Sequence, residues 1–278
     1  MCGLFGWIRP GAKTTTSLDL AEIFREGMVQ SQIRGEDATG FYTPKLGIVK
    51  ETISPDEFVN DLVPDSIADE RFVLGHCRKA SAKFRKDISN VQNPKNAQPF
   101  ESKNWVLTHN GTMDTPKIKG FNYTSKTDSE VIIAYAEKTS ITNALSSIDG
   151  SATVVLYDKK NSRITFWTNG ERPLAMAFYK GIIFYASTKS ILRDTLEPKM
   201  NCQIFPEISY AVIYECEPLT FDLKRNRFTR QKLITPKPIK KIIYHSRKKT
   251  NGKEFDSNPF LTERRTLQMG CTQNPKAI

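Results

Sequence analysis

The spacing of apolar residues along the first half of the chain predicts strands that alternate with helices. The apolar run at 3–8 ends at Arg9-Pro10-Gly11, which is typical of a buried strand followed by a turn. Apolar residues recur at helical spacing over 17–31 and predict a helix, with Thr16 or Ser17 as its cap. Further short strands are predicted at 40–43, 46–50, 72–74 and 105–107.

The second half begins with helices and then becomes a succession of strands. Thr127-Asp128-Ser129-Glu130 has the Ser/Thr-x-x-Glu form of a capping box and predicts a helix over 131–136, followed by a second helix over 141–148. After Gly150, strands are predicted at 152–157, 163–168, 174–179, 182–186 and 208–214. Strands, two helices and more strands favour an α+β fold with helices packed on sheets.

Charge separates the end of the chain from its body. The protein has 278 residues and a net charge of +11. Residues 221–278 hold 15 Lys/Arg and 4 Asp/Glu, which accounts for the whole excess. Beyond residue 232 the apolar periodicity fades and prolines interrupt the chain. We therefore expect a domain over 2–232 and a basic extension over 233–278 that docks to an acidic partner.

Composition narrows the class of protein further. No apolar run approaches the roughly 18 residues that span a bilayer, and no secretory signal is evident. The five cysteines are scattered without a CxxC pair, and with three histidines they form no metal-ligand pattern. We expect a reduced, cytoplasmic protein that needs neither metal nor cofactor and binds no membrane.

Cys2 is the first candidate for a catalytic residue. Methionine is normally removed when a small residue follows, so Cys2 would become the N-terminal residue. A thiol with a pKa of about 8.5 and an α-amine with a pKa of about 7.7–8.0 would then belong to one residue. The amine can accept the thiol proton near neutral pH, so one residue supplies both nucleophile and base.

Five segments, in order, resemble the class II glutamine amidotransferase family of N-terminal-nucleophile (Ntn) hydrolases. They are Cys2-Gly-Leu-Phe-Gly6, Arg34-Gly-Glu-Asp-Ala-Thr-Gly40, Gly75-His-Cys-Arg-Lys-Ala-Ser81, Thr108-His-Asn-Gly-Thr112 and Thr127-Asp-Ser-Glu130. Gln98-Pro99-Phe100 also resembles the His-Pro-Phe stretch of small stand-alone members, which lack a fused synthase domain. The resemblance implies an Ntn-hydrolase four-layer αββα sandwich.

The resemblance assigns the catalytic roles to three residues. Cys2 would attack the side-chain amide of glutamine and form a γ-glutamyl thioester. The side-chain amide of Asn110 and the backbone N–H of Gly111 would form the oxyanion hole. Glycine at 111 lets the backbone approach the substrate closely, and such donors typically supply several kcal/mol to the transition state.

Six further residues take binding and supporting roles in the same resemblance. Arg78 would bind the substrate α-carboxylate, which suits a bidentate guanidinium, and Ser81 would add a hydroxyl. Asp128 would receive the α-ammonium group. The supporting residues would be Arg34, Asp37 and His76.

Three functions stay open at this point. The leading one is a glutamine amidotransferase that releases ammonia for an acceptor, held by a partner protein. The second is a γ-glutamyl amide hydrolase that acts on a larger metabolite. The third is a subunit with the same fold that binds nucleic acid or protein through its basic extension, although such a module has no need for Cys2, Asn110 and Asp128 together.

Overall fold

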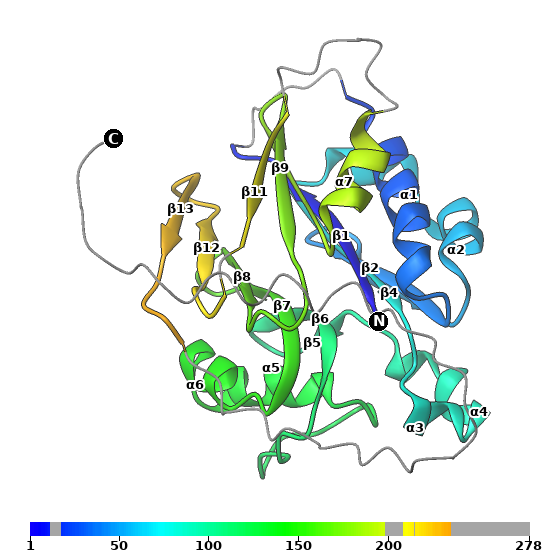
Figure 1. Ribbon diagram of the computed structural model, residues 1–278, viewed down its shortest axis with the longest axis vertical. Coiled ribbons are helices and arrows are strands. Elements are labelled where there is room, and N and C mark those ends of the chain that lie inside the picture. The colour runs from blue at the N-terminus through cyan, green and yellow to red at the C-terminus, as the bar shows by residue number, and fades with distance from the viewer. Residues whose placement is uncertain (12–17, 198–207, 214, 235–278) are drawn as a thin grey trace, which may run out of the picture. The chain divides into compact units, whose positions relative to one another are not determined.

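The computed structural model describes residues 1–11, 18–197, 208–213 and 215–234 (Figure 1). The chain divides into two units, Met1–Lys240 and Lys241–Ile278. The second unit lies outside the described residues, as does the predicted basic extension apart from residues 233 and 234. The domain boundary after residue 232 therefore stays a prediction.

The first of two antiparallel sheets has seven strands and contains the start of the chain. Its order is β11-β9-β10-β1-β4-β2-β3. The strands are β1 (Gly3–Ile8), β2 (Ala38–Thr43), β3 (Gly47–Glu51), β4 (Phe72–Arg78), β9 (Ala175–Tyr179), β10 (Ile182–Ala186) and β11 (Ser209–Val212). The pairing of β1 with β4 sets Gly3 opposite Cys77, so residue 2 lies beside the end of β4.

The second sheet has six strands in the order β13-β12-β8-β7-β6-β5. The strands are β5 (Phe100–Glu101), β6 (Trp105–Met113), β7 (Gly150–Asp158), β8 (Arg163–Thr168), β12 (Leu219–Asp222) and β13 (Arg227–Arg230). β6 and β7 pair along their full length, with Asn110 opposite Thr153. This register places residues 110 and 111 within a strand that is paired on one side by β7.

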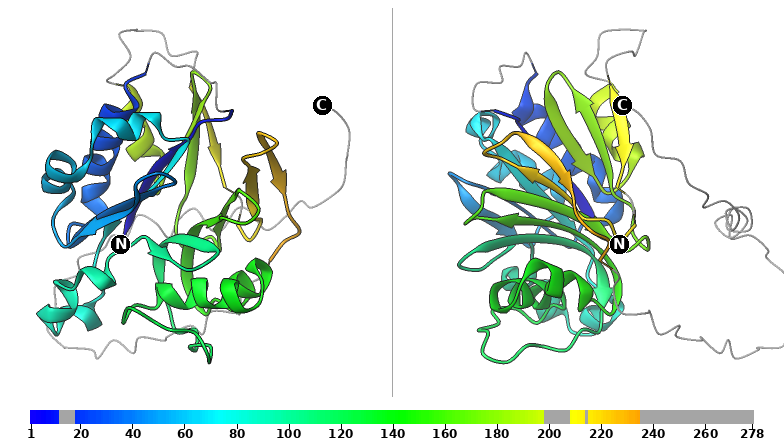
Figure 2. Two further views of the ribbon diagram at one scale, coloured as in Figure 1. Left: turned by 180° about the vertical axis from the view of Figure 1, so that it is seen from behind. Right: turned by 90° about the vertical axis from the view of Figure 1, so that its left-hand side faces the viewer.

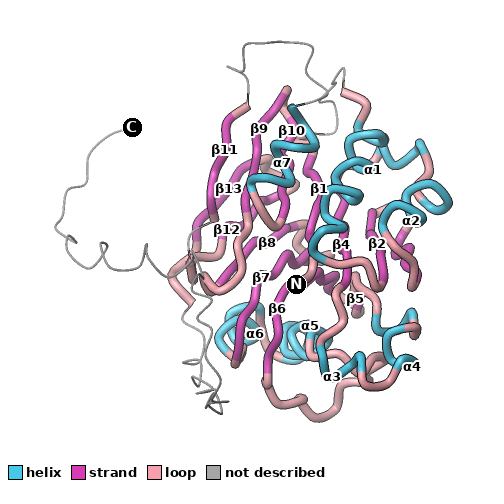
Figure 3. The backbone as a smooth tube through the Cα atoms, turned by 45° about the vertical axis from the view of Figure 1, so that its right-hand side comes forward, coloured by secondary structure: helices cyan, strands magenta, loops and turns pink. Residues whose placement is uncertain are grey.

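Helices cover the outer face of each sheet (Figures 2 and 3). α1 (Leu20–Ser31), α2 (Pro55–Leu62) and α7 (Lys189–Leu196) pack on the first sheet. α5 (Ser129–Lys138) and α6 (Ile141–Ser146) pack on the second. Between β4 and β5 the chain forms the short helices α3 (Ala82–Arg85) and α4 (Ile88–Val91). Three-residue to five-residue 3₁₀ turns occur at Gln32–Arg34, Asp65–Asp69 and Pro94–Asn96.

Alternation along β1 shows how the sequence builds these layers. Phe5 and Trp7 belong to the core between the first sheet and its helices, where they pack near Phe24 of α1. Leu4 and Ile8 point to the opposite face and join the core between the two sheets. Successive side chains of a strand face opposite sides, so an entirely apolar strand fits only between two covered faces. The result is the predicted αββα arrangement.

Most predicted elements are confirmed, while the helix caps are wrong. α1 begins after Asp19, whose carboxylate accepts a hydrogen bond from the Glu22 N–H at 3.0 Å. The predicted capping box does not form, because the Glu130 carboxylate accepts four hydrogen bonds of 2.7 to 2.9 Å from Thr124 and Ser125 instead. α2, α7, β12 and β13 were not predicted. No helix among the described residues is long and apolar enough to cross a membrane.

Candidate active site

Cys2 lies at the point where the first sheet meets the second. The residue is 9% exposed, and its Sγ accepts a hydrogen bond from the backbone N–H of Lys79 at 3.4 Å. The Nε of Arg34 donates to the carbonyl oxygen of Cys2 at 2.9 Å. The nucleophile candidate is therefore held from both its backbone and its side chain.

Asn110 reaches Cys2 from β6, across the space between the sheets. Its Oδ1 accepts a hydrogen bond from the backbone nitrogen of Cys2 at 3.0 Å. This contact fixes which way the amide points, because Oδ1 faces the Cys2 nitrogen and Nδ2 does not. Nδ2 is buried and has no hydrogen-bond partner among the described residues. A buried donor without a partner costs stability, which makes it a candidate for contact with a ligand.

Gly111 follows Asn110 at a place where no side chain fits. A Cβ at this position would lie 1.9 Å from the carbonyl oxygen of Ser151 and 2.6 Å from Nε2 of His109. Glycine is therefore required by the approach of β7 and by the buried His109 ring. It also leaves the backbone beside the Asn110 amide open to the cavity, whose lining includes Gly111.

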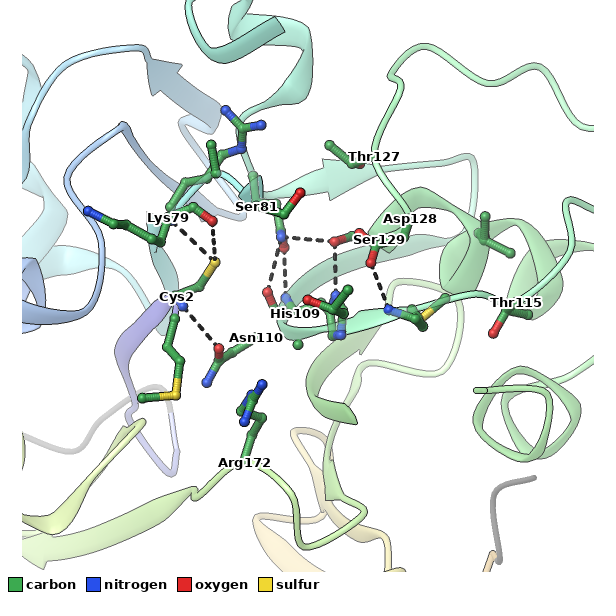
Figure 4. A pocket seen from close by; sticks show the side chains of 18 of the residues that line it. Cys2, Lys79, Ser81, His109, Asn110, Thr115, Thr127, Asp128, Ser129 and Arg172 are labelled. Carbon is green, nitrogen blue, oxygen red and sulfur yellow. Dashed lines mark hydrogen bonds between the residues drawn. The ribbon is translucent and has the colours of Figure 1, made fainter. Parts of the chain in front are cut away.

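One cavity of about 620 Å³ brings together every residue predicted to act in catalysis or substrate binding (Figure 4). Its lining includes Cys2, Arg78, Ser81, Asn110, Gly111 and Asp128. These residues lie in or next to β1, β4, β6 and α5, which are far apart in sequence. The fold thus assembles the six positions that the sequence motifs single out.

The two predicted clamp residues differ in their surroundings. Arg78 ends β4, is buried, and donates from Nη1 to the carbonyl oxygen of Val91 at 3.3 Å. Asp128 is the N-cap residue of α5 but makes no side-chain cap hydrogen bond. Its Oδ2 accepts a hydrogen bond from the Met113 N–H at 2.8 Å instead. The Asp128 carboxylate is therefore oriented by β6 rather than by its own helix.

Asp37 supports the loop that follows Arg78. Its carboxylate accepts the backbone N–H of Ala80 at 2.6 Å and forms an ion pair with Arg85 at 2.7 Å. Gly35 presses against the same loop, since a Cβ there would lie 2.5 Å from the carbonyl carbon of Arg78. The Arg34-Gly-Glu-Asp segment thus holds both Cys2 and the chain beside it.

His76 and Gln98 fix the backbone of His109; Gln98 is part of the cavity lining, whereas His76 is fully buried. The Nε2 of His76 is 3.2 Å from the His109 carbonyl oxygen, to which its N–H can donate. Gln98 accepts the His109 N–H at 2.7 Å and donates from Nε2 to the same carbonyl at 3.0 Å. Gln98 also donates to the Ser129 hydroxyl at 3.1 Å. Together they hold the residue directly before Asn110.

Burial dominates the acid–base properties of the site. It raises the pKa of the Cys2 thiol, which the Lys79 N–H, the chain amine and Arg78 partly offset. Burial also lowers the pKa of the Met1 amine; Cys2 raises it, whereas Arg34, Arg172 and Lys79 lower it further. An environment that disfavours both a free thiolate and a free ammonium favours transfer of the proton only as bond formation begins.

Some residues of the cavity wall were not predicted. Lys117, Lys126 and Arg172 line it, and all three come from loops. The loop segments 114–128 and 169–174 follow strand ends of the second sheet, and that position was the only signal available in the sequence. No group of three or more His, Cys, Asp or Glu side chains within the described ranges is arranged to hold a metal ion.

Comparison with known proteins identifies glutamine amidotransferases as relatives of this chain. A family model described as "Glutamine amidotransferase domain" matches residues 85–194. The glutamine–fructose-6-phosphate aminotransferase (isomerizing) of Helicobacter pylori is 27% identical over 225 residues, covering 71% of this chain and 34% of that protein. The protein of the same name from Oceanobacillus iheyensis is 25% identical over 216 residues. This chain spans about one third of the length of these curated relatives.

Solved structures show the same fold. Glutamine phosphoribosylpyrophosphate amidotransferase from B. subtilis superposes with a TM-score of 0.61 at 17% identity, over 83% of this chain and 49% of that one. A structure described as the allosteric regulatory enzyme of purine biosynthesis gives the same TM-score at 18% identity, over 83% of this chain and 48% of that one. At such low identity the likeness concerns the Ntn-hydrolase sandwich alone.

Proposed function

Because this chain belongs to the class II glutamine amidotransferase family, we propose that it hydrolyses the side-chain amide of glutamine at Cys2. The ammonia released would serve an acceptor held by a partner protein. In this proposal Arg78 binds the α-carboxylate of glutamine, with Ser81 beside it, and Asp128 binds the α-ammonium group. Ion pairs at both ends of the amino acid distinguish free glutamine from an amide within a protein chain.

The reaction requires that Met1 be removed, so that Cys2 carries a free α-amine. The thiol adds to the amide carbon and gives up its proton, which passes by way of the α-amine to the departing ammonia. Water then hydrolyses the γ-glutamyl thioester to glutamate and restores the thiol. The hydrogen bond from Arg34 to the Cys2 carbonyl supports this assignment, because it fixes the residue without using its amine.

The orientation of the Asn110 amide is the single observation that carries the proposal. Its Oδ1 is occupied by the Cys2 nitrogen, so Nδ2 is the atom left to donate, and it is buried beside Cys2 without a partner among the described residues. The oxygen of a tetrahedral intermediate on Cys2 would supply the missing acceptor. A donor fixed in advance stabilises developing charge without reorganisation, which is why such donors are effective.

Substitution of Asn110 by alanine tests the proposal. We expect kcat for glutamine hydrolysis to fall by about 10²–10³, with little change in KM, because the donor is needed mainly in the transition state. Asn104→Ala is the matched control: its side chain donates to Glu137 at 2.6 Å, and Asn104 is not part of the cavity lining. A change in KM alone, or equal losses in both variants, would contradict the assignment.

The size of the cavity favours a second candidate. At about 620 Å³ it falls in the range of pockets that hold drug-sized ligands, which are larger than one free amino acid. A γ-glutamyl amide with a larger amine portion would occupy more of this space than glutamine does. The chemistry at Cys2 would be the same, with an amine in place of ammonia as the leaving group.

A further inference from the structure

The cavity lining carries more positive charge than is needed to bind the α-carboxylate and the α-ammonium group of glutamine. Its lining includes the cations Arg78, Lys79, Lys117, Lys126 and Arg172 and the carboxylates Asp114 and Asp128. In the proposed function, Arg78 and Asp128 are neutralised by the α-carboxylate and the α-ammonium group. Of the four remaining cations, three are lysines whose side chains contact other side chains. The fourth is Arg172.

The three lysines are engaged within the described part of the chain. Lys79 pairs with Glu36 at 3.3 Å, Lys126 donates to Oδ1 of Asn90 at 2.8 Å, and Lys117 lies over the Tyr123 ring at 4.5 Å. Arg172 differs from them. Its Nη1 donates to the carbonyl oxygen of its neighbour Glu171 at 3.1 Å, and no carboxylate within the described ranges pairs with it.

The backbone of Arg172 is nevertheless firmly anchored. Its carbonyl oxygen accepts hydrogen bonds from the hydroxyls of Thr153 and Thr168, both at 2.7 Å. Both threonines are buried, and they lie opposite each other on β7 and β8. Pro173 follows and fixes the backbone φ angle of its own residue. The second sheet therefore holds the base of this side chain at one place in the cavity wall.

Arg172 also lies in the part of the cavity near the start of the chain. In Figure 4 it is drawn beside Asn110, on the side away from Asp128 and Ser129. Burial lowers the pKa of the Met1 amine, and Arg172 is among the charges that lower it further. Asp128 contributes to the pKa of the Cys2 thiol and of Arg78, after the larger effect of burial, and both Asp128 and Arg172 contribute to the pKa of His109.

These positions define how a substrate would lie. With its α-carbon groups at Arg78 and Asp128 and its amide carbon at Cys2, the amine portion extends away from Asp128, toward Arg172 and the space that Met1 now lines. Removal of Met1 would widen this space. The group that meets Arg172 is then carried by the nitrogen of the scissile amide.

We propose that Arg172 binds a carboxylate on the amine portion of a γ-glutamyl amide, so that the preferred substrates are γ-glutamyl derivatives of amino acids. This inference rests on the proposed thioester chemistry at Cys2. A guanidinium binds a carboxylate through two parallel hydrogen bonds, and the anchored backbone of Arg172 reduces the entropy lost when they form.

The reaction needs no reactant other than the γ-glutamyl amide and water. The Cys2 sulfur bonds to the γ-carbonyl carbon, the carbon–nitrogen bond breaks, and the thiol proton leaves on the amino acid. Water then converts the thioester to glutamate and regenerates the thiol. Arg172 touches only the leaving amino acid, so it determines specificity and is not a catalytic residue for glutamine itself.

Hydrolysis of γ-glutamylglycine, γ-glutamylethylamide and glutamine by the processed full-length chain tests the inference. We expect kcat/KM to be higher for γ-glutamylglycine than for the uncharged ethylamide. The ratio of the two should fall by about 10- to 100-fold in Arg172→Gln, which is the usual loss for a charged hydrogen bond. Arg172→Lys should give an intermediate ratio, because it keeps the charge and loses the bidentate geometry.

Lys160→Gln is the control for net charge. Lys160 is exposed in the turn between β7 and β8, outside the cavity lining, and its loss should leave the ratio as it is in the parent chain. Equal turnover of glycine and ethylamide derivatives, or an unchanged ratio in Arg172→Gln, would overturn the inference while the Cys2 chemistry stands. Failure of the parent chain to hydrolyse any of the three would instead refute the proposed function.

Discussion

The floor and the rim of the cavity are built in different ways. The floor consists of Cys2, Asn110 and Gly111, which lie in or next to strands of the two sheets; Cys2 and Asn110 are 9% and 1% exposed. The rim consists of Lys117, Lys126 and Arg172, which lie on loops. Floor residues are held by hydrogen bonds from distant segments, whereas the rim lysines are exposed.

This difference suggests a division of roles: the floor residues carry out the reaction, and the rim residues select the substrate. A nucleophile and an oxyanion donor must keep one geometry, which paired strands and a close-packed interior provide. A rim made of loops can change from one relative to another without disturbing that geometry. We therefore expect changes in the floor to act on kcat, and changes in the rim to act on the choice of substrate.

The strongest test of the floor is Cys2→Ala. We expect complete loss of glutamine hydrolysis with the thermal unfolding midpoint retained, because the thiol is the bond-forming atom and its removal leaves only a small void. Steady-state kinetics and circular dichroism measure the two effects. An electrophilic glutamine analogue should add its mass to the parent chain at Cys2 and should not label the variant.

Cys216→Ala is the matched control, since Cys216 is a free cysteine that does not line the cavity. It should be labelled and active like the parent chain. A chain shown by mass spectrometry to keep Met1 should be inactive, because its Cys2 nitrogen is an amide and cannot accept a proton. Full turnover by such a chain would disprove the role of the α-amine.

A smaller effect is expected at Asp128, between floor and rim. Asp128→Asn keeps an oxygen that can accept the Met113 N–H but removes the charge that would bind the α-ammonium group. We expect KM for glutamine to rise by about 10- to 100-fold and kcat to change little, because this contact exists in ground and transition state alike.

The neighbouring carboxylate provides the comparison for Asp128. Asp114 also lines the cavity but is exposed, so Asp114→Asn should change KM less than Asp128→Asn does. If instead the two variants behaved alike, or if Asp128→Asn lowered only kcat, the assignment of the α-ammonium site would be wrong.

The sequence predicted the floor better than the elements around it. Cys2, Asn110 and Gly111 belong to short motifs that resemble those of a known family, so they could be named without knowing the fold, and all three line one cavity. Strands such as β1 and β7 were predicted because short runs that are entirely apolar or that alternate apolar and polar residues are typical of β-strands. Both kinds of signal are local in sequence.

What could not be predicted depends on contacts between distant segments. Asp19 caps α1, and Glu130 binds the loop before its helix, yet both follow from how loops pack and not from residue spacing. Arg172 is an ordinary loop residue in the sequence. It becomes notable only when Thr153 and Thr168 fix its backbone beside Asn110.

The last expected effect concerns the support beneath the floor, and it is measured as the free energy of unfolding instead of activity. Burial lowers the pKa of His76 to about 3 from its ordinary value of 6.5, and the hydrogen bond to the His109 carbonyl opposes this shift. Between these two pH values the unfolded chain binds a proton that the folded chain excludes. Stability contributed by neutral His76 is therefore complete above pH 6.5 and is lost as the pH falls toward 3, by about 1.4 kcal/mol per pH unit.

His76→Gln isolates this contribution, because a glutamine amide can still donate to the His109 carbonyl and does not titrate. Urea unfolding of both chains between pH 7 and about pH 4 measures the difference in their free energies of unfolding. We expect the parent chain to lose stability more steeply than the variant, with the remaining slope due in part to His109, whose pKa burial also lowers. Parallel curves would show that His76 takes up its proton equally well in the folded and unfolded states, and would contradict the predicted contribution of its burial.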